Sequence, residues 1–343
     1  MAIWPNTVRS GLVALTSGAL LTACATNLLA QQAGEESGLR RYQFSEAHLG
    51  TIVSLVFYSD NRAEAKALGK RCFEKVVELD GVFSDYRDDS ELMALCKRAH
   101  EEPVPVSDEL FTVLSSALKI SAQSGGAFDI TVGASSKAWR LHRQGKQTDL
   151  VPGDGTADYR DVILDQSKRT VRLNKPLQLD LGGIAKGYIA DELARILKQG
   201  GIGHFAVSVG GEIVLGEAPP SKKGWKIGLE DAKQQVMGAV ELSHTAVSTS
   251  GDSYQFTEIG GKRSAHVLNP KTGKGKEDRC NVTVIAASGM LADGWATALR
   301  VGGVTKGSEL AGKTPAIEAL FTPRDSPLIK TMGFPGFERK SEN

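Results

Sequence analysis

Val282-Thr283-Val284-Ile285-Ala286 and Ala292-Asp293-Gly294-Trp295-Ala296-Thr297 follow one another near the C-terminal end of the chain. The first stretch is an apolar run typical of a strand, and the second continues as a helix through Arg300. Asp293 and Thr297 are four positions apart, so a helix places them one above the other on one face. A carboxylate and a hydroxyl in this arrangement are hard oxygen ligands of the kind that Mg2+ takes. Alone, the same spacing is more typical of a solvated helix face.

The composition of the 343 residues indicates a mixed fold. The 41 basic and 40 acidic side chains nearly cancel, which argues against bulk nucleic-acid binding. The length suffices for one elaborate domain or for two. The 38 glycines outnumber the 12 prolines and lie mostly at turns between short strands. We therefore predict an α+β fold that is rich in strands, with about four helices and no regular alternation of strand and helix.

Residues 1–24 have the features of a bacterial lipoprotein signal. Arg9 precedes the apolar run 11–21, which has the length of a signal-peptide core and is too short to span a membrane. The run ends in Leu21-Thr22-Ala23-Cys24, which resembles a lipobox, where the Cys is acylated and becomes the new N-terminus. Ordinary signal cleavage after Ala30 is the alternative. We favour lipidation, and acyl chains on the Cys would anchor the protein to a membrane.

The rest of the chain is expected to form one working unit. We assign residues 25–40 to a tether, 41–335 to the main domain, as one unit or as two intimately packed subdomains, and 336–343 to a tail. No stretch after the signal is long and apolar enough to cross a membrane. Three further cysteines, Cys72, Cys96 and Cys280, show no metal-ligand spacing. A disulfide between Cys72 and Cys96 is one interpretation, and buried free thiols are the favoured one.

Hydrophobic periodicity predicts the regular elements. Helices are expected at 62–83, at about 108–120 with a cap at Ser107-Asp108, and at 185–198. Strands are expected at 51–57, 162–164, 170–173, 206–209, 212–215, 225–229, 240–242, 246–249, 254–259 and 266–268.

The segment Asp180-Leu181-Gly182-Gly183-Ile184-Ala185-Lys186-Gly187 runs from a strand end into a helix. Paired glycines let the backbone approach a ligand closely, and a helix N-terminus favours phosphate. Lys186, in the first turn of that helix, is able to reach a phosphate oxygen. The segment is neither a Walker A loop nor a dinucleotide fingerprint. The alternative is a sterically required turn followed by a surface lysine.

Other polar segments are individually weak signals. Ser248-Thr249-Ser250-Gly251-Asp252 is a small polar turn, and such turns are commonly plain hairpin connections. His266 is either structural or a general acid or base. Gly126-Ala127-Phe128-Asp129 places an aromatic ring and a carboxylate beside a glycine, and Tyr86 stands in a turn where its ring is free to stack. Together these segments predict a site for a phosphorylated aromatic ligand and a hard cation.

Five segments, taken in this order, resemble one family, the FAD:protein FMN transferases (ApbE-like flavin transferases). The resemblance implies a mixed, largely antiparallel, strand-rich α+β fold with helices packed on the sheets. It implies an enzyme of the bacterial cell envelope, facing the periplasm, that splits FAD and attaches FMN by a phosphoester bond to a Thr or Ser of a target protein, releasing AMP. The segments are Phe83-Ser84-Asp85-Tyr86 with Ser90-Glu91-Leu92, Gly125-Gly126-Ala127-Phe128-Asp129, Asp180 to Tyr188, Ser250-Gly251-Asp252 with His266 and Asn269-Pro270-Lys271-Thr272-Gly273, and Met290-Leu291-Ala292-Asp293 with Thr297.

The resemblance also assigns roles to single residues. Asp293, Thr297 and the backbone carbonyl of Gly183 resemble the Mg2+ ligands of the family. His266 is expected to transfer a proton, with Asp252 as a weaker candidate for that role. Positions that resemble FAD-binding residues are Leu49, Tyr86, Ala127, Phe128, Asp129, Asp180, Lys186, Ser250 and His266. At Leu49 the family usually has Met.

The partners implied by the resemblance are FAD and an acceptor protein, with a membrane electron-transport subunit as the usual kind of target. Two other functions stay open. One is an Mg2+-dependent FAD pyrophosphatase, in which water replaces the acceptor hydroxyl. The other is a non-catalytic lipoprotein that binds FAD, although such a binder has no need of Asp293, Thr297 and His266.

Overall fold

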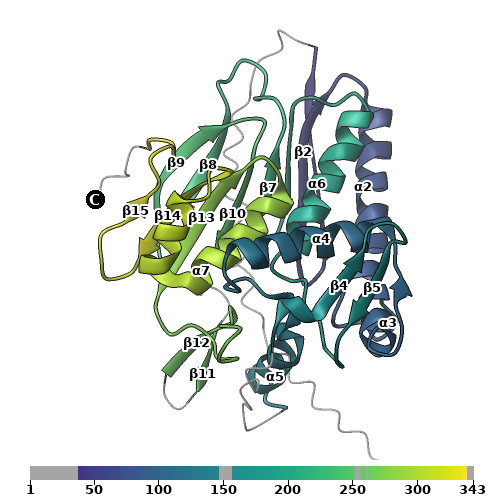
Figure 1. The fold of residues 1–343 in the computed structure, drawn as a ribbon. Helices are drawn as coiled ribbons and strands as arrows, with labels where there is room; N and C mark the ends of the chain where they lie inside the picture. Colours follow the sequence, from purple (N-terminus) through teal and green to yellow (C-terminus); the bar gives the residue numbers. More distant parts are fainter. Residues whose placement is uncertain (1–37, 147–156, 252–255, 260–261, 338–343) are drawn as a thin grey trace, which may run out of the picture.

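A computed structural model describes residues 38–146, 157–251, 256–259 and 262–337. Its centre is an eight-stranded sheet in the order β1-β2-β6-β7-β10-β13-β14-β15 (Figure 1). Every neighbouring pair in this sheet is antiparallel. The strands are β1 (Arg40–His48), β2 (Thr51–Ser59), β6 (Phe205–Val209), β7 (Glu212–Leu215), β10 (Ala246–Ser250), β13 (Cys280–Ala286), β14 (Ile317–Pro323) and β15 (Ile329–Lys330).

Three smaller sheets complete the strands of the described residues. Their orders are β3-β5-β4, β8-β9 and β11-β12. They comprise β3 (Val104–Pro105), β4 (Val162–Asp165), β5 (Thr170–Leu173), β8 (Trp225–Glu230), β9 (Val236–Leu242), β11 (Phe256–Ile259) and β12 (Lys262–Ala265).

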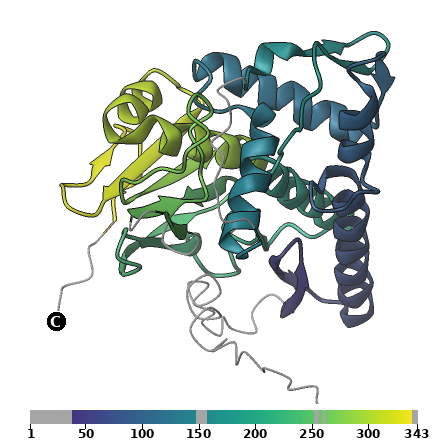
Figure 2. The same cartoon turned by 90° about the horizontal axis from the view of Figure 1, so that it is seen from below.

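The described residues contain six α-helices and two short 3-10 helices. Seen from below, the helices of the N-terminal half, in blue, lie beside the sheet and helix of the C-terminal half, in green and yellow (Figure 2). The helices are α2 (Arg62–Phe83), α3 (Glu91–Arg98), α4 (Asp108–Gln123), η2 (Ile130–Val132), α5 (Gly133–Arg143), η3 (Tyr159–Asp161), α6 (Ala185–Gln199) and α7 (Gly289–Gly312).

The central sheet has a hydrophobic core on each face. Successive side chains along a strand point to opposite faces and so alternate between the two cores. On β2, Leu55 and Phe57 belong to the large core that includes residues of α2, α4, α6 and α7. Their neighbours Val56 and Tyr58 belong to a second core under the β8–β9 hairpin. There the ring of Tyr58 lies 6.2 Å from that of Trp225, measured between centroids. Helices therefore cover one face, and the hairpin covers the other.

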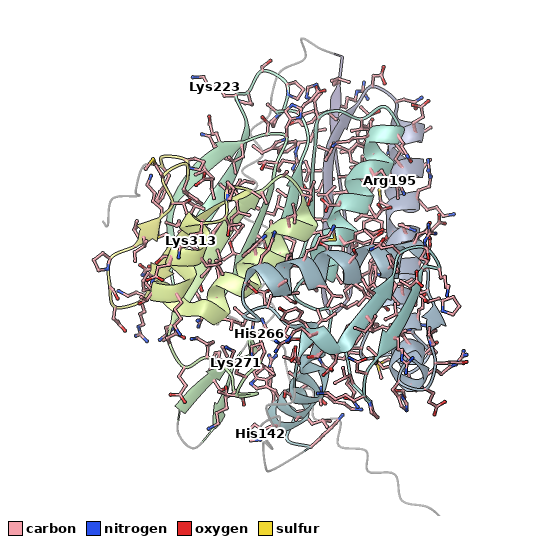
Figure 3. All side chains as sticks on the ribbon, viewed as in Figure 1. His142, Arg195, Lys223, His266, Lys271 and Lys313 are labelled. Carbon is pink, nitrogen blue, oxygen red and sulfur yellow. The ribbon has the colours of Figure 1, made fainter. Side chains whose placement is uncertain are left out.

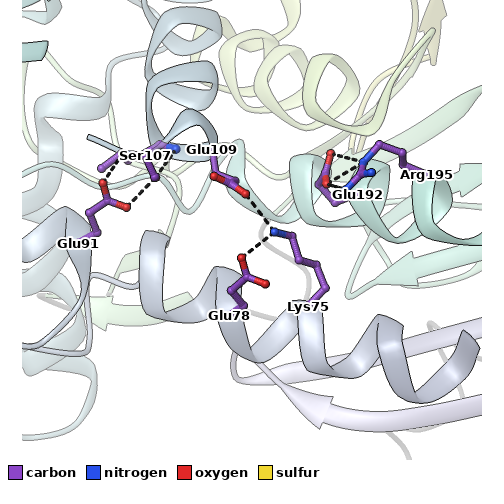
Figure 4. A network of polar contacts seen from close by, with 8 residues as sticks. Lys75, Glu78, Glu91, Ser107, Glu109, Glu192 and Arg195 are labelled. Atoms are coloured by element: carbon purple, nitrogen blue, oxygen red, sulfur yellow. Dashed lines mark hydrogen bonds and ion pairs between the residues drawn. The ribbon is translucent and has the colours of Figure 1, made fainter. Parts of the chain in front are cut away.

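Polar contacts fix α4 against its neighbours (Figure 4). Nζ of Lys75 on α2 lies 3.0 Å from Oε1 of Glu109 on α4 and 2.8 Å from Oε1 of Glu78. The carboxylate of Glu91 on α3 accepts hydrogen bonds from both N and Oγ of Ser107, at 2.6 and 2.7 Å. Ser107 also caps α4 by accepting from N of Leu110. Because these contacts hold α4 in place, they also fix the start of the loop that follows it, residues 125–129.

Helix α7 is longer than the sequence pattern indicates. It begins at Gly289, capped by Ser288, and extends to Gly312 with a kink at Gly303, where φ is +70°. Only glycine adopts this backbone conformation without strain, which accounts for the residue at the kink. Just before it, the fully buried Arg300 donates through Nη1 to Oδ1 of Asp278 at 3.0 Å. The loop before β13 is thus attached to the middle of α7.

The predicted fold class is correct, and most element boundaries agree with it. The predicted helix 62–83 coincides with α2, and the capped helix 108–120 and helix 185–198 lie within α4 and α6. The predicted number of about four helices was too small, because α5 was missed. The length of α7 was understated. The predicted domain start at residue 41 falls within β1, which begins at Arg40. All three described cysteines are free and buried, as the favoured interpretation held.

Two predicted strands differ in the structure. Strand 266–268 does not form: His266 and Val267 lie in a bend after β12, and Leu268 makes only an isolated bridge to Gly275. Strand 254–259 is described from Phe256, as β11, because Tyr254 lies outside the described residues. Within the described residues no helix is long and apolar enough to cross a membrane.

Candidate functional site

The predicted cation ligands come together where α6 begins beside α7. Asp293 and Thr297 are one turn apart on α7, and Asp293 is 3% exposed. A Cβ placed on Gly183, just before α6, would stand 3.0 Å from Oγ1 of Thr297. The backbone of Gly183 therefore lies against the Thr297 hydroxyl. Two segments far apart in the sequence, 180–187 and 292–297, therefore lie against each other.

The turn before α6 is held by its own side chains. Oδ1 of Asp180 accepts a hydrogen bond from N of Gly182 at 2.8 Å. Nζ of Lys186, in the first turn of α6, donates back to the carbonyl oxygen of Gly182, also at 2.8 Å. The position of the lysine ammonium is thus coupled to the conformation of the Gly-Gly turn.

Helices α6 and α7 cross at two glycines, which sets the position of Asp293. A Cβ on Gly187 would lie 2.1 Å from the carbonyl oxygen of Gly289 and 2.8 Å from Cβ of Asp293, so only glycine fits. N of Gly187 donates to Oδ2 of Asp293 at 3.0 Å. Asp191 of α6 accepts from N of Gly289 and N of Met290, at 2.7 and 2.9 Å, and so satisfies the start of α7. Burial raises the pKa of Asp191 to about 6.

Glu212 is part of this site, and the sequence analysis did not identify it. Nζ of Lys186 lies 3.2 Å from Oε1 of Glu212 and 3.6 Å from Oδ2 of Asp293. Burial raises the pKa of Glu212 to about 7 and also raises that of Asp293. Burial by itself lowers the pKa of Lys186, but the attraction of Asp293 and Glu212 outweighs it and the pKa is raised. One half-buried ammonium is therefore shared between two buried carboxylates.

The donor set fits a small hard cation. Both contacts of Asp293 use Oδ2, which leaves its Oδ1 without a hydrogen bond among the described residues. Oε2 of Glu212 is likewise buried without a partner in the described part of the chain. The described residues contain no cluster of three or more His, Cys, Asp or Glu able to hold a metal. One carboxylate, one hydroxyl and one carbonyl suit Mg2+, which keeps waters and takes substrate phosphates as further ligands.

The loop 125–129 supplies an aromatic wall and a structural carboxylate. Phe128 is buried, and its Cε2 would be 3.3 Å from a Cβ on Gly183. Asp129 is also buried and accepts three hydrogen bonds, from N and Oγ1 of Thr131 and from N of Tyr159. Ala127 is half-buried beside them. Phe128 therefore borders the cation site, whereas the carboxylate of Asp129 shapes the loop.

A cavity of about 600 Å3 opens beside this loop. Gly126 and Asp129 form part of its wall, and Pro270 and Lys271 form another part. Two of the segments that carry the family resemblance thus border one polar space. Tyr159 and Lys175 complete this side of the cavity.

Tyr86 is presented on the surface by an arginine. The ring is 73% exposed, and the guanidinium carbon of Arg140 lies 4.3 Å from its centroid. Nη2 of Arg140 lies 2.6 Å from Oδ2 of Asp85, and Nη1 lies 3.9 Å from Oδ2 of Asp180. Burial and the neighbouring charge of Asp180 raise the pKa of Asp85 to about 6. Asp180 therefore accepts a hydrogen bond from the Gly-Gly turn and is linked, through Arg140, to the segment that carries Tyr86.

Leu49 and Ser250 lie at the ends of sheet strands. Leu49 has a φ of +54° in the turn between β1 and β2 and packs against the large core. A Cβ on Gly210 would lie 3.1 Å from Oγ1 of Thr51 and 3.5 Å from Oε2 of Glu212, which places this turn beside the acidic pair. Ser250 ends β10 opposite Val282 and makes no hydrogen bond to Lys186 or Asp293 in the described structure.

His266 lies on the β11–β12 side of the structure, next to α5 (Figure 3). Its side chain is exposed, and its ring meets that of the buried Trp139 on α5 edge to face, with 6.4 Å between centroids. The bend after β12 thus brings His266 against α5, the helix that also carries Arg140. Asp252, the weaker candidate for proton transfer, and Cys24, the predicted lipidation site, lie outside the described residues.

The chain is similar in sequence to the members of one protein family. The model of the ApbE family matches residues 49–321. A protein of Vibrio cholerae named FAD:protein FMN transferase is 31% identical over 315 residues, covering 89% of this chain and 91% of that protein. A protein of the same name from Treponema pallidum is 32% identical over 314 residues, covering 84% and 86%.

Solved structures show the same fold. The flavin transferase ApbE of Vibrio cholerae superposes with a TM-score of 0.76 at 28% identity, covering 86% of this chain and 98% of that one. The apo form of the Pseudomonas stutzeri flavinyl transferase ApbE gives a TM-score of 0.77 at 28% identity, covering 86% and 95%.

Proposed function

The chain belongs to the ApbE family and is a flavin transferase, and from this premise we propose that it transfers FMN from FAD to a Thr or Ser of a second protein with the help of Mg2+. The observation that carries the proposal is the meeting of Gly183, Asp293 and Thr297 at the start of α6. These groups would hold the cation, and the pyrophosphate of FAD would complete its ligands.

The proposed reaction exchanges the phosphoanhydride bond of FAD for a phosphoester bond to the acceptor. The acceptor hydroxyl oxygen bonds to the phosphorus of the FMN half, the bond from that phosphorus to the bridging oxygen breaks, and AMP leaves with that oxygen. Such a transfer depends mainly on positioning and on neutralisation of charge. When bound, Mg2+ would supply charge neutralisation on the pyrophosphate oxygens. No nucleophile from this chain is needed, since the acceptor provides it.

The residues of the chain take separate roles in this proposal. The ammonium of Lys186, held by Glu212 and Asp293, presents positive charge at the N-terminus of α6, where phosphate is favoured. The exposed imidazole of His266 accepts the proton of the acceptor hydroxyl, and its contact with Trp139 fixes its approach. Tyr86 and Leu49 offer aromatic and apolar surfaces suited to the flavin ring, and the buried Phe128 packs behind Gly183. Asp180 holds the Gly-Gly turn, and Asp129 holds the loop 125–129.

We also propose that the protein is a lipoprotein on the periplasmic side of the bacterial envelope. Support comes from Leu21-Thr22-Ala23-Cys24 alone. Acylation of Cys24 would attach the domain to the membrane through the tether, near acceptors that are themselves membrane proteins. Metabolic labelling with a palmitate analogue tests this, because replacement of Cys24 by Ala should abolish the label and release the protein from the membrane fraction.

The test of the transfer reaction mixes the purified protein with FAD, Mg2+ and an acceptor domain that carries the target Thr, and then measures the acceptor's intact mass and the AMP released. A gain of one esterified FMN, equal in amount to the AMP and lost with EDTA, is expected. AMP and free FMN with an unchanged acceptor would instead indicate a pyrophosphatase. If the protein binds FAD and leaves it intact, the proposal that it is an enzyme would be contradicted.

A further inference from the structure

Arg140 connects two turns that the proposed FAD site uses. Its Nη2 lies 2.6 Å from Oδ2 of Asp85, in the turn after α2, and its Nη1 lies 3.9 Å from Oδ2 of Asp180, in the turn before α6. The other oxygen of Asp180 accepts from N of Gly182 and so fixes the Gly-Gly turn. A single guanidinium therefore ties the segment that carries Tyr86 to the segment that leads to Lys186.

The same guanidinium covers one face of the Tyr86 ring. Its carbon lies 4.3 Å from the ring centroid, the distance of a cation–π contact. Tyr86 is nevertheless 73% exposed, so the opposite face of the ring is open to solvent. An exposed tyrosine ordinarily samples several rotamers, and holding one of them lowers the entropy lost when a ligand binds.

The ion pairs explain why Arg140 stays in place. The side chains of Asp85 and Asp180 are 13% and 18% exposed, and that of Arg140 is 18% exposed. If the guanidinium turned away, two poorly solvated carboxylates would be left facing each other. The planar guanidinium is able to contact two carboxylates and still lie flat over a ring, whereas a lysine ammonium acts as a point charge.

We propose that Arg140 is a positioning residue that holds the Tyr86 ring so that its open face stacks on the flavin ring of FAD. This inference rests on the proposed function, because it takes FAD as the ligand at Tyr86. Arg140 does not touch the reacting phosphate in this proposal. It acts on affinity for FAD through Tyr86 rather than on the chemical step.

The experiment measures FAD affinity by flavin fluorescence with EDTA present, so that no turnover occurs, and kcat and KM for FAD in the transfer assay. Arg140→Lys is expected to weaken FAD binding about fivefold, within the range of a cation–π contact, and to change kcat less than about twofold. In a Tyr86→Ala background the same Arg140→Lys change is expected to have no further effect, because the ring through which it acts is gone.

Arg143→Lys is the matched control. Arg143 lies on the same helix and its guanidinium is 5.8 Å from the Trp139 ring, so it tests the loss of an arginine beside an aromatic ring without the two carboxylates. Wild-type FAD affinity in Arg140→Lys would overturn the inference while the transfer activity stood. An equal loss in the Tyr86→Ala background would also overturn it, since Arg140 would then act through Asp85 and Asp180. A wild-type protein that transfers no FMN in the assay with Mg2+ would overturn the proposed function as well.

Discussion

The ammonium nitrogen of Lys186 lies 3.2 Å from Oε1 of Glu212, a residue outside every motif that the sequence analysis singled out. The contact matters because the same ammonium lies 3.6 Å from the carboxylate of Asp293. Glu212 thus draws the lysine partly away from the carboxylate that is proposed to bind the cation. The relative strength of the Lys186–Glu212 and Lys186–Asp293 ion pairs therefore determines how readily Asp293 binds a cation.

Replacement of Glu212 by Gln should therefore raise the Mg2+ concentration needed for activity. With the second anionic partner gone, Lys186 pairs more strongly with Asp293 and competes with the cation for it. We expect the half-saturating Mg2+ concentration to rise about threefold to tenfold, or roughly 1 kcal/mol of cation binding. Transfer rates measured across a Mg2+ titration give this value. Glu241→Gln, which removes an exposed partner of Lys226, is the control, and an unchanged Mg2+ requirement in Glu212→Gln would refute the competition.

Asp293→Asn should abolish transfer and leave the fold nearly intact. The amide oxygen is able to keep the hydrogen bond from N of Gly187, but the charge that binds the cation is lost. A fall of at least about 1,000-fold in kcat/KM is expected, as for the loss of a main electrostatic element of catalysis. AMP release measures the activity, and thermal unfolding measures the fold. Transfer at more than a few per cent of the wild-type rate would exclude Asp293 as a cation ligand.

Thr297→Val and Thr297→Ser separate the hydroxyl from the shape of the side chain. Valine keeps the methyl contact near Gly183 and removes Oγ1, whereas serine keeps the oxygen. We expect the valine variant to lose about 10-fold to 100-fold in activity at low Mg2+ and to recover in part at high Mg2+, while serine stays within about threefold of wild type. The two Mg2+ titration curves are the measurement. Equal losses in both variants would point to packing rather than ligation.

Gly187→Ala should separate α6 from α7. The new Cβ would lie 2.1 Å from the carbonyl oxygen of Gly289, and neither backbone is able to move without disturbing Asp293. We expect a loss of about 2–4 kcal/mol in the free energy of unfolding, together with loss of transfer. Gly81→Ala on α2 is the matched control, because nothing lies within 4 Å of its added Cβ and helix propensity favours alanine by up to about 1 kcal/mol. Urea unfolding compares the two.

Ionisation of Asp191 should lower the free energy of unfolding as the pH rises through about 6. Burial raises the pKa of this carboxyl from 3.8 in the unfolded chain to about 6 in the fold. The folded state therefore binds this proton more tightly than the unfolded chain does. The protonated carboxyl contributes its full stabilisation at a pH below the pKa of the unfolded chain, and this contribution is lost as the pH rises through the pKa of the folded state. Between pH 5 and pH 7.5, Asp191→Asn should gain roughly 1–2 kcal/mol relative to wild type. Urea unfolding at both pH values gives the difference, and parallel behaviour of the two proteins would contradict the shift.

Where local pattern and tertiary packing agreed, the fold was predictable from the sequence. Helix α2 has an apolar stripe and an Asn61 cap, and its predicted bounds coincide with the observed ones. Strand β1 was not predicted because it is an edge strand in which only Tyr42 and Phe44 pack against the large core, too short an alternation to mark a strand. The predicted strand at His266 was wrong, since the apolar pair Val267-Leu268 packs in a bend instead.

The site was predictable only in part. Gly183, Asp293 and Thr297 lie together as predicted, because each belongs to a segment with its own signature. Glu212 could not be identified from the sequence, because a glutamate at the start of a strand is common. Only the fold brings Lys186 next to it. Arg140 was missed for the same reason, since its partners Asp85 and Tyr86 come from one turn and Asp180 comes from another.

The crossing of α6 and α7 through Gly187 and Gly289 has a consequence for protein engineering. The distance between the lysine and the aspartate of the site is set by contact of two backbones, and no choice of rotamer is able to restore it once the helices part. A graft of this site onto another scaffold therefore has to carry the two helices as one crossed pair. Substitution of the functional side chains alone onto a foreign pair of helices would reproduce the chemistry without its geometry.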